Sequence, residues 1–278
     1  RLVSSSEGGS IVFRSPAVGA LHALVADHAV QGRVIFPGAG YLEVARAAAG
    51  SVALCGVYFL QPLAVEAAGL LVECAMWDGR FEVRSCDAES LEEVTVHCSG
   101  ATAVADSVVW QHVDHASLRT GFCAADVGAL YDWYHTTNVQ YGPGYRTLVQ
   151  AWAGVGAAAA RLQARSVRQG TAVHPADLDD ALCVGVLAVA RGDGETRLPF
   201  AVDMAQLQGA ADALWAVRRG LPFPKQDKRA PPLTSDGACT CMRAGRLWRR
   251  RWLRQCPCEW ARKTSRHRRN WPAPNRVL

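Results

Sequence analysis

The sequence predicts an α+β fold made of two similar units, each with one main helix packed against an antiparallel β-sheet. Two observations lead to this prediction. Strand-like apolar runs surround one amphipathic helical stretch in residues 1–105, and the same order of elements returns in residues 123–220. The chain has 278 residues and is 50% hydrophobic, which is enough to bury a core in both units. The repeat is one of architecture and not of sequence.

In the first unit, the sequence predicts two short strands, one helix and then four longer strands. The helix covers residues 38–50, where apolar side chains recur at spacings of three and four and Gly50 can end the last turn. Asp78 and Gly79 separate two apolar runs, which is typical of a tight hairpin turn. We expect the strands at residues 9–15, 33–36, 52–60, 69–77, 80–86 and 92–100.

A more polar stretch, residues 106–122, is the predicted linker to the second unit. The main helix of that unit is expected at residues 174–190. Pro175 suits its first turn, and Asp177 places a carboxylate where the helix dipole favours negative charge. The remaining expected elements are a helix at 125–137, a turn at 141–145 and strands at 147–154, 157–165, 198–209 and 213–220.

Residues 221–278 differ in composition from the rest of the chain. Residues 1–220 contain 15 arginines, no lysine and 22 acidic residues, a net charge of −7. The last segment contains 15 basic and 3 acidic residues, a net charge of +12, and four of the nine tryptophans. We predict that this basic Arg/Trp/Cys-rich tail is disordered. A segment that binds nucleic acid and a shift of the coding frame near residue 220 are the other interpretations.

Composition also argues against several classes of protein. The ten cysteines are scattered along a chain too long for a small disulfide scaffold. The pairs at 239–241 and 256–258 have C-x-C spacing, which is a poor match to zinc sites, so no metal site is predicted. No apolar run approaches the roughly 20 residues of a membrane span, and the N-terminus lacks the pattern of a secretory signal. We therefore expect a cytoplasmic protein with no membrane segment.

Four short motifs occur along the two units in a fixed order. They are H-x3-G-x4-P at His28, Gly32 and Pro37, YGPGY at 141–145, HPADLDDAL at 174–182 and LPF at 198–200. Together they resemble the dehydratase domain of modular polyketide synthases and animal-type fatty acid synthases. The resemblance covers about residues 9–219. It rests on the joint occurrence of the four motifs, because any one of them alone would be weak.

The chain departs from the family pattern at two positions. The second motif of the family usually reads Y-G-P-x-F, and Tyr145 replaces the phenylalanine. The third motif usually carries Gln or His four residues after its aspartate, and Cys183 occupies that position. A thiol is a weak hydrogen-bond donor, so this change predicts a less firmly held Asp179. The neighbouring Asp180 adds like charge and is expected to raise the pKa of that carboxyl.

The resemblance implies a double hotdog fold, in which two helix-in-sheet units lie side by side with the active site between them. It implies that His28 and Asp179 come from different units and meet across a substrate tunnel. It also implies the activity of a 3-hydroxyacyl-[acyl-carrier-protein] dehydratase, a hydro-lyase. The expected partners are an acyl carrier protein and other synthase domains, within a homodimeric synthase. Neither a membrane nor a nucleic acid is an expected partner.

The proposed chemistry explains these residue types. Loss of water from a β-hydroxyacyl thioester needs a base for the α-proton, and imidazole, with a pKa of about 6.5, suits His28. The leaving hydroxyl needs a proton donor, and an apolar setting can keep the Asp179 carboxyl protonated. Backbone N–H groups near Gly38 and Gly40 are predicted to bind the thioester oxygen. Substrate contacts are also expected at Tyr141 and Cys183. No cofactor is needed beyond the phosphopantetheine that carries the substrate.

Two alternatives remain open from the sequence. One is a different activity on the same scaffold, such as double-bond isomerisation or product-template cyclisation, which the same His-Asp pair could serve. The other is a degenerate, non-catalytic domain with a structural role in a larger synthase. The second unit also lacks a further alternating apolar run after residue 220, which predicts an incomplete sheet.

Overall fold

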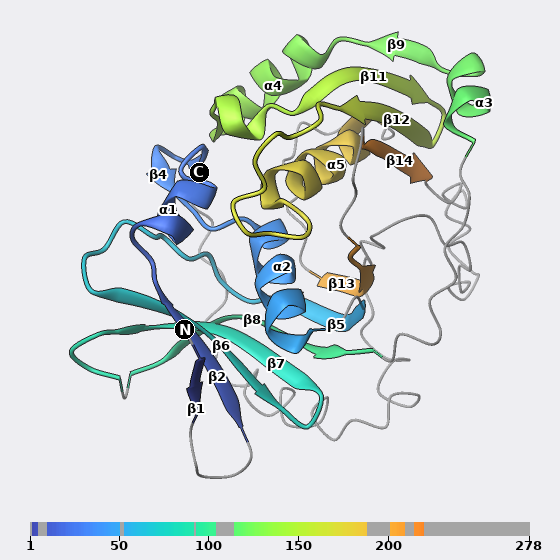
Figure 1. Cartoon of the computed structure of the whole chain (residues 1–278). Helices are drawn as coiled ribbons and strands as arrows, with labels where there is room; N and C mark the ends of the chain where they lie inside the picture. Colours follow the sequence, from blue (N-terminus) through green and yellow to red (C-terminus); the bar gives the residue numbers. More distant parts are fainter. Residues whose placement is uncertain are drawn as a thin grey trace, which may run out of the picture. The chain divides into compact units, whose positions relative to one another are not determined.

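The computed structural model describes residues 2–4, 10–50, 53–91, 93–103, 114–187, 201–208 and 214–219. These residues form one seven-stranded sheet, one four-stranded sheet and one small three-stranded sheet, all antiparallel, with helices packed against them (Figure 1). The predictions for the tail at 221–278, and for any strand after residue 220, fall outside the described residues.

The seven-stranded sheet forms the frame of the first unit. Its hairpin between β6 (Leu70–Trp77) and β7 (Arg80–Asp87) turns at Asp78 and Gly79, whose φ values of 46° and 70° fit the twist of a two-residue turn. Alternate side chains such as Phe81 and Val83 are buried on one face of the sheet. In spatial order the strands are β1 (Leu2–Ser4), β2 (Ile11–Pro16), β6 (Leu70–Trp77), β7 (Arg80–Asp87), β8 (Thr95–Thr102), β5 (Ala53–Phe59) and β13 (Ala201–Gln206).

Helix α2 (Gly38–Ala49) packs across this sheet against β5, β6 and β7. Pro37, with extended backbone, begins it, and Gly50 ends it in the left-handed conformation at φ 61°. The face with Leu42 and Ala45 is fully buried in the first hydrophobic core. Burial of an apolar stripe of this kind is the main source of stability for a helix of three turns. The predicted main helix of the first unit is therefore confirmed.

The second unit contains the four-stranded sheet, in the order β14 (Trp215–Arg219), β12 (Ala157–Leu162), β11 (Leu148–Gly154) and β9 (Cys123–Ala125). Helix α5 (Pro175–Leu187) packs against β11, β12 and β14, and it also contacts α2 of the first unit. Its Leu178 belongs to the core of the first unit, whereas Val184 belongs to that of the second. Two further helices are α3 (His115–Thr120) and α4 (Val127–Thr136).

A small sheet joins the two units through backbone hydrogen bonds. Its strands lie in the order β10 (Val139–Tyr141), β3 (His28–Val30) and β4 (Arg33–Val34). The register places Tyr141 directly opposite His28. Helix α1 (Ala20–Val25) precedes β3, and the short 3₁₀-helix η2 (Pro143–Tyr145) follows β10. This sheet brings the first and second sequence motifs together.

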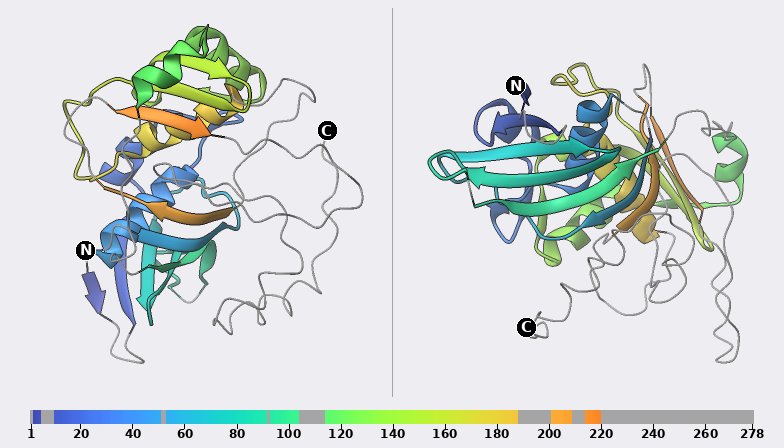
Figure 2. Two further views of the ribbon diagram at one scale, coloured as in Figure 1. Left: turned by 90° about the vertical axis from the view of Figure 1, so that its right-hand side faces the viewer. Right: turned by 90° about the horizontal axis from the view of Figure 1, so that it is seen from below.

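Several elements differ from the sequence prediction. The strand expected at 33–36 ends at Val34, with one isolated bridge from Ile35 to Ala64. Part of the predicted linker forms α3, and the strand β9 was not predicted. The strand from the predicted stretch 198–209, β13, pairs with β5 in the first sheet, as the two views in Figure 2 show. The division into 1–105 and 123–220 stays a prediction, and this strand pairing crosses it.

Candidate active site

His28 begins β3 at the junction of the two units, and it is 8% exposed. Its Nδ1 lies 2.7 Å from the carbonyl oxygen of Ile35. Because a carbonyl can only accept a hydrogen bond, Nδ1 carries the proton and Nε2 is left with a free lone pair. The ring is held further by edge contacts with Tyr141 and Tyr145, whose ring centroids lie 5.7 and 5.5 Å away. The imidazole is therefore fixed in the tautomer of a base.

Asp179 lies early in α5 and faces His28 across the junction. Its Oδ2 is 3.9 Å from Nε2 of His28, and this oxygen accepts no hydrogen bond from the described residues. Burial raises the pKa of the Asp179 carboxyl, while the nearby His28 ring and the Tyr141 hydroxyl oppose that rise. The pair thus combines a fixed imidazole lone pair with a carboxyl whose environment favours the protonated form.

Tyr141 and Cys183 lie together beside this pair. The Tyr141 hydroxyl is 3.3 Å from Sγ of Cys183, and both side chains are buried. Burial raises the pKa of the Cys183 thiol far above its usual value, and the charges of Asp179 and Asp180 add to that effect. The thiol therefore stays neutral. It contacts Tyr141, and the predicted loosening of Asp179 and the predicted substrate contacts of Tyr141 and Cys183 stay predictions.

Asp180, the neighbour of Asp179, is held by hydrogen bonds from two other parts of the second unit. Its carboxylate accepts hydrogen bonds from the Tyr131 hydroxyl at 2.9 and 3.0 Å, and from the backbone N–H and hydroxyl of Thr147 at 2.5 and 2.6 Å. Burial raises the pKa of Asp180 to about 7, and the charge of Asp179 adds to the rise. Burial is the largest cause of the raised pKa of Asp179. Asp180 ties α5 to α4 and to the start of β11.

Gly38 and Gly40 lie in the first turn of α2, as predicted. The Gly40 N–H donates to the carbonyl of Pro37 at 2.9 Å, so it is already engaged. A Cβ at Gly40 would lie 2.6 Å from the Phe36 ring, whereas one at Gly38 would lie 3.3 Å from Phe59. Glycine at position 40 is therefore explained by packing alone. Their predicted role in binding the thioester oxygen stays a prediction, with Gly38 the better placed of the two.

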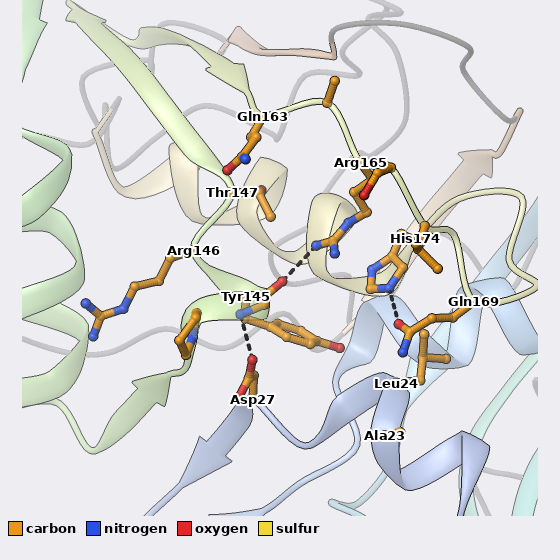
Figure 3. Close-up of a pocket in the computed structure, with 15 residues that line it drawn as sticks. Ala23, Leu24, Asp27, Tyr145, Arg146, Thr147, Gln163, Arg165, Gln169 and His174 are labelled. Atoms are coloured by element: carbon orange, nitrogen blue, oxygen red, sulfur yellow. Dashed lines mark hydrogen bonds between the residues drawn. The ribbon is translucent and has the colours of Figure 1, made fainter.

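A polar cavity of about 440 Å³ lies beside the pair without including it. Figure 3 shows its wall, where Asp27 accepts from the Gly144 N–H and Arg165 donates to the Gly144 carbonyl. His174, in the third motif, bonds Gln169 at 2.8 Å and accepts from the Ala176 N–H, so its role at the start of α5 is structural. Tyr145 lines this cavity and also packs on His28.

Sequence reasoning missed the residues that hold the site together from a distance. Tyr131 and Thr147 anchor Asp180, and Asp27 pins the turn that carries Tyr145. Tyr131 lies on the buried face of α4, and this position on the helix is the only sequence feature that could have indicated its role. No group of three or more His, Cys, Asp or Glu side chains suited to a metal lies in the described part of the chain. None of its helices is long and apolar enough to cross a bilayer.

Comparison with known proteins shows the family of the chain. A family model described as the polyketide synthase dehydratase domain matches residues 1–85. A second, described as the polyketide synthase dehydratase N-terminal domain, matches residues 111–247. The chain belongs to the polyketide synthase dehydratase family. The second match extends beyond residue 220, into the segment that the sequence analysis set apart as a tail.

Individual relatives are large synthases. Polyketide synthase ThaG of Burkholderia thailandensis is 32% identical over 216 residues, which are 70% of this chain and 4% of ThaG. Polyketide synthase PksN of Bacillus subtilis is 26% identical over 245 residues, which are 79% of this chain and 4% of PksN. The chain thus spans about one twenty-fifth of the length of the relatives that it matches.

Solved structures of dehydratase domains share the fold. The dehydratase domain of the CurF module of curacin polyketide synthase matches with a TM-score of 0.69 and 22% identity, over 80% of this chain and 87% of that one. The dehydratase domain of the terminal module of rifamycin polyketide synthase matches with a TM-score of 0.63 and 26% identity, over 77% and 82%. The predicted double hotdog fold is confirmed.

Proposed function

We propose that this dehydratase domain removes water from a β-hydroxyacyl thioester carried on an acyl carrier protein, giving the α,β-enoyl thioester. The observation that carries the proposal is the buried pair at the junction of the two units. The Ile35 carbonyl holds Nδ1–H of His28, so Nε2 is the ring nitrogen available to act as the base, and Asp179 faces it at 3.9 Å with a raised pKa. Two groups with opposite protonation states at close range suit an elimination that needs one base and one acid.

In the proposed reaction, Nε2 of His28 takes the proton from the α-carbon, and the electron pair of that C–H bond forms the new double bond. The bond from the β-carbon to oxygen breaks, and the proton of Asp179 goes to the departing oxygen, which leaves as water. The pair is then an imidazolium and a carboxylate, and return of one proton from His28 to Asp179 restores it. The step consumes no cofactor, since the phosphopantetheine arm serves only to carry the substrate.

Solved structures of relatives support the proposed roles of His28 and Asp179, although what is described for them applies to those proteins. Two solved structures of the curacin CurK dehydratase are described as inactive mutants, one with histidine changed to phenylalanine and one with aspartate changed to asparagine. The large size of the relatives supports the proposal that the chain works beside other synthase domains, and we propose that these include an acyl carrier protein within a homodimeric synthase. Both partner proposals follow from the domain family and not from a contact seen here.

The test is a dehydration assay on the purified chain with a short β-hydroxyacyl carrier protein, following the loss of 18 mass units, the mass of water, on the intact carrier. We expect His28→Ala and Asp179→Asn each to lose activity by about a thousandfold or more, because each removes one of two groups that act together. His135→Ala and Asp132→Asn are matched controls, because both side chains lie on the exposed surface of α4. A folded wild-type chain that releases no water would contradict the proposal.

A further inference from the structure

Two buried oxygen atoms close to His28 have no hydrogen-bond partner among the described residues. They are Oδ2 of Asp179 and the hydroxyl oxygen of Tyr145. The Tyr145 side chain is 2% exposed, and its ring centroid lies 5.5 Å from that of His28. After burial, the charge of Asp179 is the largest cause that raises the pKa of the Tyr145 phenol. The phenol therefore lies within the field of that carboxyl, beside the proposed acid.

The neighbouring tyrosines show that this arrangement is unusual within the site. The Tyr131 hydroxyl donates to Asp180, and the Tyr141 hydroxyl contacts Sγ of Cys183. A buried hydroxyl without a partner is destabilising, because it has given up its hydrogen bonds to water. A phenylalanine at position 145 would fill the same space without that penalty. The unpaired hydroxyl of Tyr145 thus points to a ligand that supplies the missing partner.

The segment that carries Tyr145 is held firmly on both sides. Asp27 accepts from the Gly144 N–H at 2.6 Å, and Arg165 donates to the Gly144 carbonyl at 2.8 Å (Figure 3). The Tyr145 N–H donates to the Gly142 carbonyl at 3.0 Å, which closes the short helix η2. A hydroxyl on such a pinned turn keeps its position without further ordering when a substrate binds, as an efficient hydrogen-bond donor requires.

We propose that the Tyr145 hydroxyl is a third catalytic group, which donates a hydrogen bond to the β-hydroxyl oxygen of the substrate as that oxygen leaves. The inference rests on the proposed function. The β-oxygen is the fitting partner because Asp179, whose charge the phenol senses, is the proposed proton donor to that same atom. Tyr145 neither gains nor loses a proton in the step. It stabilises the negative charge that develops on oxygen while the carbon–oxygen bond breaks and the proton of Asp179 arrives.

The first test is Tyr145→Phe, measured in the dehydration assay with a range of substrate concentrations. We expect kcat to fall at least tenfold and KM to rise by no more than about fivefold, because the hydrogen bond strengthens as the bond to oxygen breaks. We also expect an unchanged or higher Tm, since the variant removes an unpaired buried hydroxyl. If Tyr145 had only a structural role, its replacement would not lower kcat while leaving the Tm unchanged or higher.

The matched control is Tyr41→Phe. The Tyr41 hydroxyl is also buried without a partner among the described residues, but its raised pKa comes from burial and, after that, from Cys98 and not from Asp179. This variant should gain stability in the same way and keep its kcat. Equal kcat for Tyr145→Phe and the wild type would overturn the inference while leaving the proposed function intact.

A binding measurement separates failure of the inference from failure of the proposed function. An α,α-dimethyl β-hydroxyacyl pantetheine has no α-proton to lose, so it binds without reacting, and its analogue without the hydroxyl serves for comparison. By calorimetry, the wild type should prefer the hydroxylated compound about fivefold, as one net hydrogen bond predicts. Tyr145→Phe should lose that preference. If the wild type prefers the hydroxylated compound but never releases water, the proposed function fails and the Tyr145 contact stands. If the wild type and Tyr145→Phe show the same preference, the contact is overturned.

Discussion

At the scale of single residues, Asp180 is a buried carboxyl whose shifted pKa makes stability depend on pH. Burial raises its pKa from 3.8 to about 7 despite three hydrogen-bond donors around it. A carboxyl with a raised pKa is protonated in the folded state at a pH where it is ionised in the unfolded state. Its contribution is therefore present below the unfolded pKa of about 4 and is lost as the pH rises to about 7.

This linkage predicts a difference between the wild type and Asp180→Asn. Between pH 4 and pH 7 the wild type should lose free energy of unfolding relative to the variant, on the order of 3 kcal/mol, because only the wild type has this carboxyl to ionise. The comparison with a variant is needed because His174 has a pKa lowered to about 4, and its effect on stability runs the other way. Denaturant unfolding at several pH values would measure it.

The exposed Asp132→Asn provides the control for that experiment, and it should keep the slope of the wild type. Equal slopes for the wild type and Asp180→Asn would show that Asp180 is ionised in the folded state across this range. The three donors from Tyr131 and Thr147 would then outweigh burial.

At the scale of elements, the first turn of α2 depends on close packing against the chain that precedes it. A Cβ at Gly40 would lie 2.6 Å from the ring of Phe36, which is itself buried. The helix therefore requires glycine at this position for steric reasons, independently of any contact with the substrate.

Gly40→Ala should lower the free energy of unfolding by about 1–3 kcal/mol, because the added methyl group displaces a buried aromatic ring. Gly38→Ala is the matched comparison, since its Cβ would meet Phe59 at 3.3 Å and needs only a small adjustment. Thermal unfolding measures both. A smaller loss for Gly40→Ala than for Gly38→Ala would contradict the packing account.

The secondary-structure elements also show which features of the fold a local sequence pattern can predict. Helix α2 and helix α5 were predicted because amphipathic spacing and end signals are local, and the hairpin at Asp78 and Gly79 was predicted for the same reason. Strands β3 and β10 have only three residues each, too few to show a period. Their pairing, which places Tyr141 opposite His28, depends on partners more than 100 residues apart.

In the candidate site, too, some residues could be predicted from the sequence and others could not. The motifs indicated His28 and Asp179, and the structure places the two side chains face to face. The contacts of Asp180 with Tyr131 and Thr147 could not be inferred, because they join three separate elements. A spacing pattern also carries no information on which buried hydroxyl is left without a partner.

At the scale of the whole molecule, strand β13 ties the two units together. It follows α5 in the chain, yet it pairs with β5 at the edge of the first sheet, while β14 returns to the second sheet (Figure 2). The chain after α5 therefore supplies an edge strand to each of the two sheets. Leu178 of α5 adds to this coupling, because it is buried in the core of the first unit.

This coupling predicts that the two units unfold in one cooperative transition. In a variant that keeps only the stacked pair Trp152 and Trp215, tryptophan fluorescence reports on the second sheet, whereas circular dichroism reports on both sheets. We expect the two probes to give coincident denaturation curves. Ala205→Pro, which disrupts the fully buried pairing of β13 with β5, should lower both midpoints together. Separate transitions would show that the two units unfold independently of each other.

The central claim is that His28 and Asp179 act as one catalytic unit, and a double-variant cycle tests it most directly. Single-turnover rates of water loss would be measured for the wild type, His28→Ala, Asp179→Asn and the double variant, with folding checked by circular dichroism. The account predicts that the double variant is no slower than the slower single variant, because removal of either group already abolishes the concerted step. Losses that multiply in the double variant, or a single variant that keeps the rate of the wild type, would contradict it.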